Sequence, residues 1–141
     1  GTAEYSKRLS AYSKVNIIEI PDESIPGAAS AKEEATVLEK EGERILRQLK
    51  PGTFTIALAV EGEAMPSEAL AAYLADLSLR GRSDVNIIIG GSLGLSPAVL
   101  AAADLRLSFS RFTFPHQLMR LILLEQLYRA EKITRGETYH K

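Results

Sequence analysis

The sequence predicts an α/β fold with a mostly parallel sheet and helices on both of its faces. Apolar segments of strand length alternate with longer segments of helical periodicity, which is typical of such sheets. Residues 53–60 are almost continuously apolar, as strands covered on both faces are. A chain of 141 residues can bury its own core, so we expect one domain over residues 1–141.

The first elements each carry local signals. Residues 1–12 predict a polar helix, and residues 15–20 predict a strand that ends in turn residues. Ser30 is a favourable N-cap for a helix that continues to about Lys50, where Pro51 and Gly52 stop it. This helix has one apolar stripe, and we expect its charged side chains to face water. The strand at residues 53–60 follows.

The second half continues the alternation. A helix is expected from Ser67 to about Arg80, followed by the strand at residues 84–89. Ser96 and Pro97 have the residue types of an N-cap and a first helical residue, and predict a short helix to Ala103. Alternating apolar and polar residues from position 105 predict a fourth strand, and residues 117–130 a long final helix.

The composition excludes several classes of site. The chain has no cysteine, so it contains no disulfide, thiolate nucleophile or zinc–thiolate site. With two histidines, we expect no metal site. No apolar run is long enough to span a bilayer and no signal-peptide pattern is present, so we expect no membrane association. A reducing cytoplasm is compatible with this composition.

Charge is distributed unevenly along the chain. Residues 1–104 carry 10 Lys and Arg against 15 Asp and Glu, whereas residues 105–141 carry 7 against 3. The basic end suits a protein that meets a phosphate backbone on one face, and it is equally compatible with a solvated helix face.

Three segments should meet at one edge of the sheet. Ligands of parallel sheets bind outside the carboxyl ends of the strands, where residues 58–62, 90–95 and 109–114 are expected. Pro115 removes a backbone donor and favours an extended Phe114, so the third segment should be a shaped loop that offers its main chain to a ligand. The three loops therefore predict a binding cleft.

The glycine cluster at residues 90–94 does not fit the known phosphate loops. Its spacing is not that of a dinucleotide loop, and about twenty residues later stands Arg111 where an acidic residue would bind the ribose. No Gly-Lys-Ser/Thr follows, which excludes a P-loop. Two interpretations remain: glycines that permit a tight turn, or a loop that closely approaches an adenosine-like ligand.

A few polar residues are candidates for contact with a nucleotide. Arg111 lies beside aromatic residues and is either a surface charge or a partner of a phosphate or base. His116 opens the last helix, where a capping or packing role is the alternative. Tyr139, His140 and Lys141 end the chain, either as a solvated tail or within reach of a nucleotide.

At these residues the sequence resembles a known family. The segments are IIIGGSLGLS (residues 87–96), LSFSRFTFPHQLMRLILLEQLYRA (107–130), RGETYHK (135–141) and KEGERIL (40–46). Together they are similar to the bacterial RlmH family, SPOUT-class methyltransferases that modify pseudouridine in large-subunit ribosomal RNA. The resemblance covers the whole chain, with one departure. Family members begin with a strand and a glycine-lysine loop ahead of the helix at residues 1–12, and this sequence lacks them.

The resemblance implies a fold, a cofactor and a reaction. It implies a homodimer, in agreement with the nearly all-round apolar final helix, and a trefoil knot in the C-terminal half. The reaction would be methyl transfer to N3 of a pseudouridine in 23S rRNA of the assembled 70S ribosome, in the cytoplasm. The methyl donor, S-adenosylmethionine, would be bound by Leu58, Gly90, Phe109, Ser110, Arg111, Phe112, Thr113 and Phe114.

Further roles follow from the same resemblance. His140, Tyr139 and Arg111 would act at the target base, and Arg135, Lys141 and His116 would bind the RNA. Two alternatives stay open. One is a catalytically inert relative that binds ribosomes or RNA with the same fold, and the other is an unrelated α/β nucleotide-binding enzyme.

Overall fold

A computed structural model describes residues 14–20, 30–91 and 93–137 of the chain. The helix predicted over residues 1–12 lies outside these residues. The described elements alternate as predicted, in the order β1 (Lys14–Glu19), α2 (Ala31–Gln48), β2 (Phe54–Ala64), α3 (Ser67–Leu79), β3 (Asp84–Ile89), α4 (Pro97–Ala102), β4 (Leu105–Ser108) and α5 (His116–Thr134).

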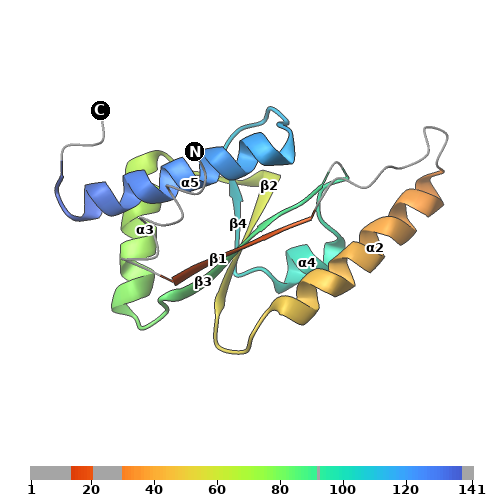
Figure 1. The fold of residues 1–141 in the computed structure, drawn as a ribbon, viewed down its shortest axis with the longest axis horizontal. Coiled ribbons are helices and arrows are strands. Elements are labelled where there is room, and N and C mark those ends of the chain that lie inside the picture. The colour runs from red at the N-terminus through yellow and green to blue at the C-terminus, as the bar shows by residue number, and fades with distance from the viewer. Residues whose placement is uncertain (1–13, 21–29, 92, 138–141) are drawn as a thin grey trace.

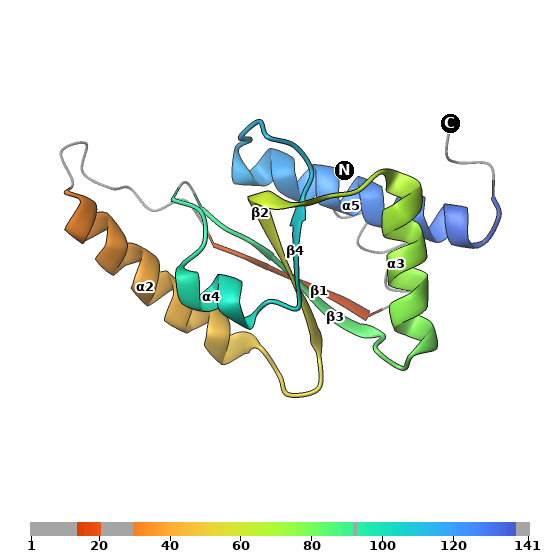
Figure 2. The same cartoon turned by 180° about the vertical axis from the view of Figure 1, so that it is seen from behind.

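The described strands form one sheet in the order β1-β3-β2-β4, and each neighbouring pair is parallel. Helices α3 and α5 cover one face, and α2 and α4 cover the other (Figures 1 and 2). The predicted α/β class with helices on both faces is therefore confirmed. In the described part of the chain, no helix combines the length and apolar character needed to cross a membrane.

The two faces of the sheet bury separate apolar clusters. On the α3/α5 side, Ile56 and Ile87 pack with Leu123, Leu124 and Leu127 of the last helix. On the α2/α4 side the cluster contains Ile18, Ile45, Ile88 and Val99. Successive residues of β3 point to opposite faces, and because both faces are covered, the strand ends in three consecutive isoleucines, residues 87–89.

Most helix boundaries agree with their sequence signals. Ser30 and Ser96 cap α2 and α4, since their hydroxyls accept hydrogen bonds of 3.2 Å from the amides of Glu33 and Val99. Helix α5 continues to Thr134, past the predicted end at residue 130. The expectation for charged residues of α2 is wrong at Glu41, which is only 8% exposed.

Strand β2 is longer than predicted. Residues 61–63 were expected beyond the strand, but the strand continues to Ala64 with a shift of register against β4. Leu58 and Glu63 both pair with Leu107, so the chain between them leaves the ladder and returns. The Glu-Gly-Glu sequence of residues 61–63 has the composition of a turn, so the sequence did not predict that the strand continues through it.

Candidate ligand-binding site

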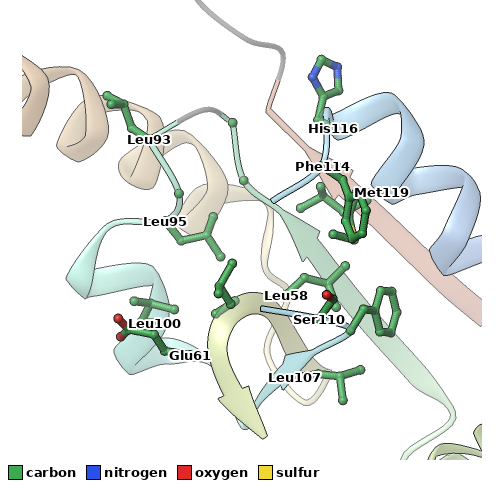
Figure 3. A pocket seen from close by; sticks show the side chains of 17 residues that line it. Leu58, Glu61, Leu93, Leu95, Leu100, Leu107, Ser110, Phe114, His116 and Met119 are labelled. Carbon is green, nitrogen blue, oxygen red and sulfur yellow. The ribbon is translucent and has the colours of Figure 1, made fainter. Parts of the chain in front are cut away.

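A cavity of about 370 Å³ lies at the carboxyl ends of β2, β3 and β4. This volume is within the range of small-molecule sites. The lining includes residues of all three predicted loops, with Leu100 of α4 and Met119 of α5 (Figure 3). The lining residues are Leu58, Ala59, Val60, Glu61, Ile89, Gly90, Gly91, Leu93, Gly94, Leu95, Leu100, Leu107, Phe109, Ser110, Phe114, His116 and Met119.

The irregular part of β2 forms one wall. The buried Ser108 hydroxyl lies 3.0 Å from the carbonyl oxygen of Val60 and 3.1 Å from that of Ser110, so it links this wall to the loop that follows β4. A Cβ on Gly62 would lie 2.7 Å from the carbonyl carbon of Arg106. Only glycine lets the two backbones approach so closely, and the wall depends on this contact.

The glycine loop forms a second wall. The Gly94 amide donates a 3.0 Å hydrogen bond to the Gly91 carbonyl, and Gly94 has a positive φ of 81°. A Cβ on Gly90 would lie 2.7 Å from the Gly94 carbonyl oxygen. The glycines therefore form a tight turn and also line the cavity, which accommodates both interpretations of their spacing.

The segment 109–114 is divided between the cavity and its surroundings. Phe109, Ser110 and Phe114 line the cavity. The Phe112 amide donates a 2.9 Å hydrogen bond to the Ser110 hydroxyl, which turns the chain outward there. Arg111, Phe112 and Thr113 are exposed and outside the lining, and the Phe112 side chain is 77% exposed.

The first turns of α5 form the side of the cavity opposite Leu100. His116 and Met119 line it there, with Phe114 beside them (Figure 3). Arg120 donates a hydrogen bond to Glu19, and the ion pair fastens the start of α5 to the end of β1. His116 borders the cavity at the start of α5, and its ring points away from the other labelled side chains (Figure 3).

Other predicted site residues lie elsewhere. Arg135 follows the last residue of α5, a helix of 19 residues, and is separated from the cavity by the helix length of about 28 Å (Figure 1). Its side chain pairs with Glu137 at 3.6 Å. Tyr139, His140 and Lys141 lie outside the described residues.

Sequence reasoning missed Leu100, whose short helix had been given no role, and Met119, whose helix had been expected to contact the sheet and a second copy of the chain. For Met119 a signal was present, because it lies one helical turn after His116 on the same face. No group of three or more metal-ligating side chains occurs within the residues that the structure describes.

The cavity has the chemistry of a binding site for a small, partly apolar molecule. Its walls are mainly Leu, Ile, Phe and Met side chains together with glycine backbone. Of the described lining residues, Glu61 and His116 are the ones with titratable side chains, and they lie on opposite sides (Figure 3). Such a site can position a heterocycle by shape and main-chain contacts.

A family model described as "Predicted SPOUT methyltransferase" matches residues 1–140. The chain belongs to the SPOUT methyltransferase family. Two relatives of this SPOUT methyltransferase, both named ribosomal RNA large subunit methyltransferase H, come from Pelotomaculum thermopropionicum and Bifidobacterium adolescentis. The first is 59% identical over 140 residues, which are 99% of this chain and 88% of the relative. The second is 58% identical over 139 residues, 99% of this chain and 87% of the relative.

A third relative of this SPOUT methyltransferase bears the same name and comes from Clostridioides difficile. It is 55% identical over 141 residues, which are 100% of this chain and 89% of the relative. The family recognised in the sequence is therefore confirmed. In this SPOUT methyltransferase, residues of the three predicted loops meet at the cavity.

Proposed function

We propose that this chain is an S-adenosylmethionine-dependent methyltransferase that methylates N3 of a pseudouridine in 23S rRNA of the assembled ribosome. The observation that carries the proposal is the cavity at the carboxyl ends of β2, β3 and β4, in a chain of the SPOUT methyltransferase family. The names of the relatives, which specify large-subunit ribosomal RNA, support the choice of substrate.

The cavity fits the methyl donor. Its volume of about 370 Å³ suits a nucleoside with a short side chain. Leu58, Leu95 and Met119 offer apolar surfaces for an adenine ring, and Gly90 and Gly91 leave backbone groups accessible for hydrogen bonds. When bound, the donor supplies a methyl group on a positively charged sulfur, which is already a strong electrophile.

The protein's own part is then alignment and exclusion of water. Leu58, Gly90 and the cavity-lining residues of the segment 109–114 hold the donor, so that its methyl group faces the incoming base. The target N3 carries a proton that must leave, and we assign contact with this base to His140 and Tyr139. Arg111 stabilises negative charge that develops on the base.

Contacts with the RNA backbone are assigned to His116, Arg135 and Lys141, because cationic side chains orient nucleic acids through their phosphates. Since Arg135 is a helix length from the cavity of its own chain, a second copy is the simplest way to bring it to the RNA. The apolar side chains of Leu118 and Leu121, 42% and 38% exposed on α5, support a homodimer. We further infer one domain with a trefoil knot in its C-terminal half, working in the cytoplasm, where assembled ribosomes are found.

The deciding experiment is transfer of labelled methyl from S-adenosylmethionine to intact ribosomes that lack the modification, followed by nucleoside analysis. We expect the label in N3-methylpseudouridine. Binding of the donor without transfer would instead favour an inert relative that only binds RNA. Ribosomes that already carry the modification are the matched control, and they should accept no label.

A further inference from the structure

One acidic residue in the wall of the cavity has no role in the function proposed above. Of the described residues that line the cavity, Glu61 is the one with an acidic side chain. It lies beside Leu100, across the cavity from His116 and Met119 (Figure 3). Because the intended substrate is a polyanion, an exposed carboxylate near it would weaken binding by repulsion unless it serves another contact.

The position of Glu61 is set by the surrounding backbone. It lies in the segment that leaves the ladder between Leu58 and Glu63. On one side of it, the Val60 carbonyl is held by the Ser108 hydroxyl, and on the other, Gly62 lies against the backbone of β4. The neighbours on both sides are thus fixed, and the irregularity of β2 places Glu61 in the cavity wall.

Glu61 also has a defined relation to the glycine loop. That loop follows β3, and β2, which carries Glu61, is the adjacent strand in the sheet. In the dinucleotide-binding Rossmann fold, which has a different glycine loop, a carboxylate at a strand end beside that loop accepts a hydrogen bond from the ribose, and Glu61 has a comparable place here. Here the acidic residue precedes the glycine loop in sequence, and Arg111 occupies the position about twenty residues after the glycines.

We propose that Glu61 binds the ribose of the methyl donor, its carboxylate accepting hydrogen bonds from the 2′- and 3′-hydroxyls. This inference rests on the proposed function, because it presupposes an adenosine ligand in the cavity. A diol suits a carboxylate that offers two acceptor oxygens, and hydrogen bonds to a charged acceptor are stronger than neutral ones. Glu61 then contributes to recognition of the donor and takes no part in methyl transfer.

The placement of Glu61 favours the ribose over the amino-acid part of the donor. The reacting methyl must face the RNA, and His116, one of its expected contacts, lies at the start of the helix across the cavity from Leu100. Glu61 therefore lies on the side of the cavity away from the reacting end, where the sulfur joins the amino acid.

The test is calorimetric binding of two pairs of ligands to the full chain and to its variants. The first pair is 5′-methylthioadenosine and its 2′,3′-dideoxy analogue, and the second is S-adenosylhomocysteine and 5′-methylthioadenosine. In the native chain we expect loss of both hydroxyls to weaken binding about 10- to 100-fold. In Glu61→Ala the two members of the first pair should bind within about threefold of each other, because the acceptor is gone.

Glu63→Ala is the matched control. Glu63 lies two residues further along β2, is exposed and does not line the cavity, so its removal should leave the penalty for the dideoxy analogue intact. A full penalty in Glu61→Ala would overturn the inference. So would a loss in Glu61→Ala confined to S-adenosylhomocysteine, which would assign the carboxylate to the ammonium group. Failure of S-adenosylhomocysteine to bind the native chain would instead contradict the proposed function itself.

Discussion

Gly42 of α2 lies directly against Ser96, the N-cap residue of α4. A Cβ on Gly42 would overlap the Ser96 hydroxyl and lie 3.1 Å from Ser96 Cβ. Ser96 directly follows the glycine loop of the cavity, so this close approach of two helices supports one wall of the site from behind. The segment 40–46, one of those that carry the family resemblance, thereby bears on the site.

Gly42→Ala tests this support. Alanine favours a helix by about 1 kcal/mol over glycine, whereas forcing atoms into a packed contact costs about 1–3 kcal/mol. We expect the clash to prevail and the free energy of unfolding to fall, as measured by urea denaturation. In a Ser96→Ala background the same change should cost less, because the overlapping hydroxyl is absent. Strictly additive effects of the two changes would contradict this relationship.

Gly90→Val should remove donor binding and leave the chain folded. The new side chain would displace Gly94, whose carbonyl oxygen lies 2.7 Å from the Cβ position, and so distort the loop that lines the cavity. We expect S-adenosylhomocysteine to bind at least about 100-fold more weakly, a loss of about 2.7 kcal/mol, measured by calorimetry. Ala101→Val, on the exposed side of α4, is the control for added bulk. Unchanged affinity of Gly90→Val would show that the donor binds elsewhere.

Glu131 should destabilise the folded state at neutral pH. It borders a second cavity, of about 300 Å³, between α3 and α5. Burial raises its pKa above the ordinary 4.5, against a smaller opposing effect of Arg135. The folded state thus binds the proton more tightly than the unfolded chain. Protonated Glu131 therefore favours the folded state below the ordinary pKa, and this contribution to the free energy of unfolding is lost as the pH rises through the raised pKa of the folded state.

Glu131→Gln, which keeps this position neutral, is expected to raise the free energy of unfolding at pH 7 by less than about 1 kcal/mol, since solvent screens the partly exposed group. At pH 3 the gain should disappear. The control is Glu137→Gln. A hydrogen bond from Lys132 lowers the pKa of Glu137, so this substitution should lower the free energy of unfolding at pH 7. Denaturation curves at the two pH values measure both effects. An equal gain from Glu131→Gln at pH 3 would exclude titration as its cause.

Charged residues on the exposed face of α5 should separate the proposed dimer. Leu118→Asp together with Leu121→Asp would place two carboxylates in an apolar contact, where an unpaired charge is strongly unfavourable. We expect sedimentation velocity to show a dimer for the native chain and a monomer for this variant. Leu79→Asp alters a side chain that is 88% exposed on α3, and it should leave the dimer intact. A native chain that sediments as a monomer would contradict the dimer.

The order and type of the described elements could be predicted because each has a strong local signal. Ser96 and Pro97 marked the start of α4, and β3 was predicted at its observed bounds. The convergence of three loops followed from a general property of parallel sheets and is confirmed by the residues that line the cavity.

Features that depend on particular contacts, most of them between distant segments, could not be predicted. The shifted register of β2 needs Gly62 to meet the backbone of β4, and no local pattern reveals such a partner. The same holds for buried Glu41, whose charge suggested exposure. The division of residues 109–114 between the cavity and solvent results from the short-range bond between Ser110 and Phe112, which sequence composition does not specify.

The parallel pairing of β1 with β3 has a consequence for how the chain acquires its structure. Asn16 and Asn86 face each other in register although they are 70 residues apart in sequence. Among the described strands β3 is the one that pairs with β1, so during synthesis this pairing waits until β3 has been made, and closing so long a loop is slow. This edge of the sheet is then a late step in folding. Substitutions in β1, such as Ile17→Val, should hasten unfolding while leaving the rate of refolding nearly unchanged.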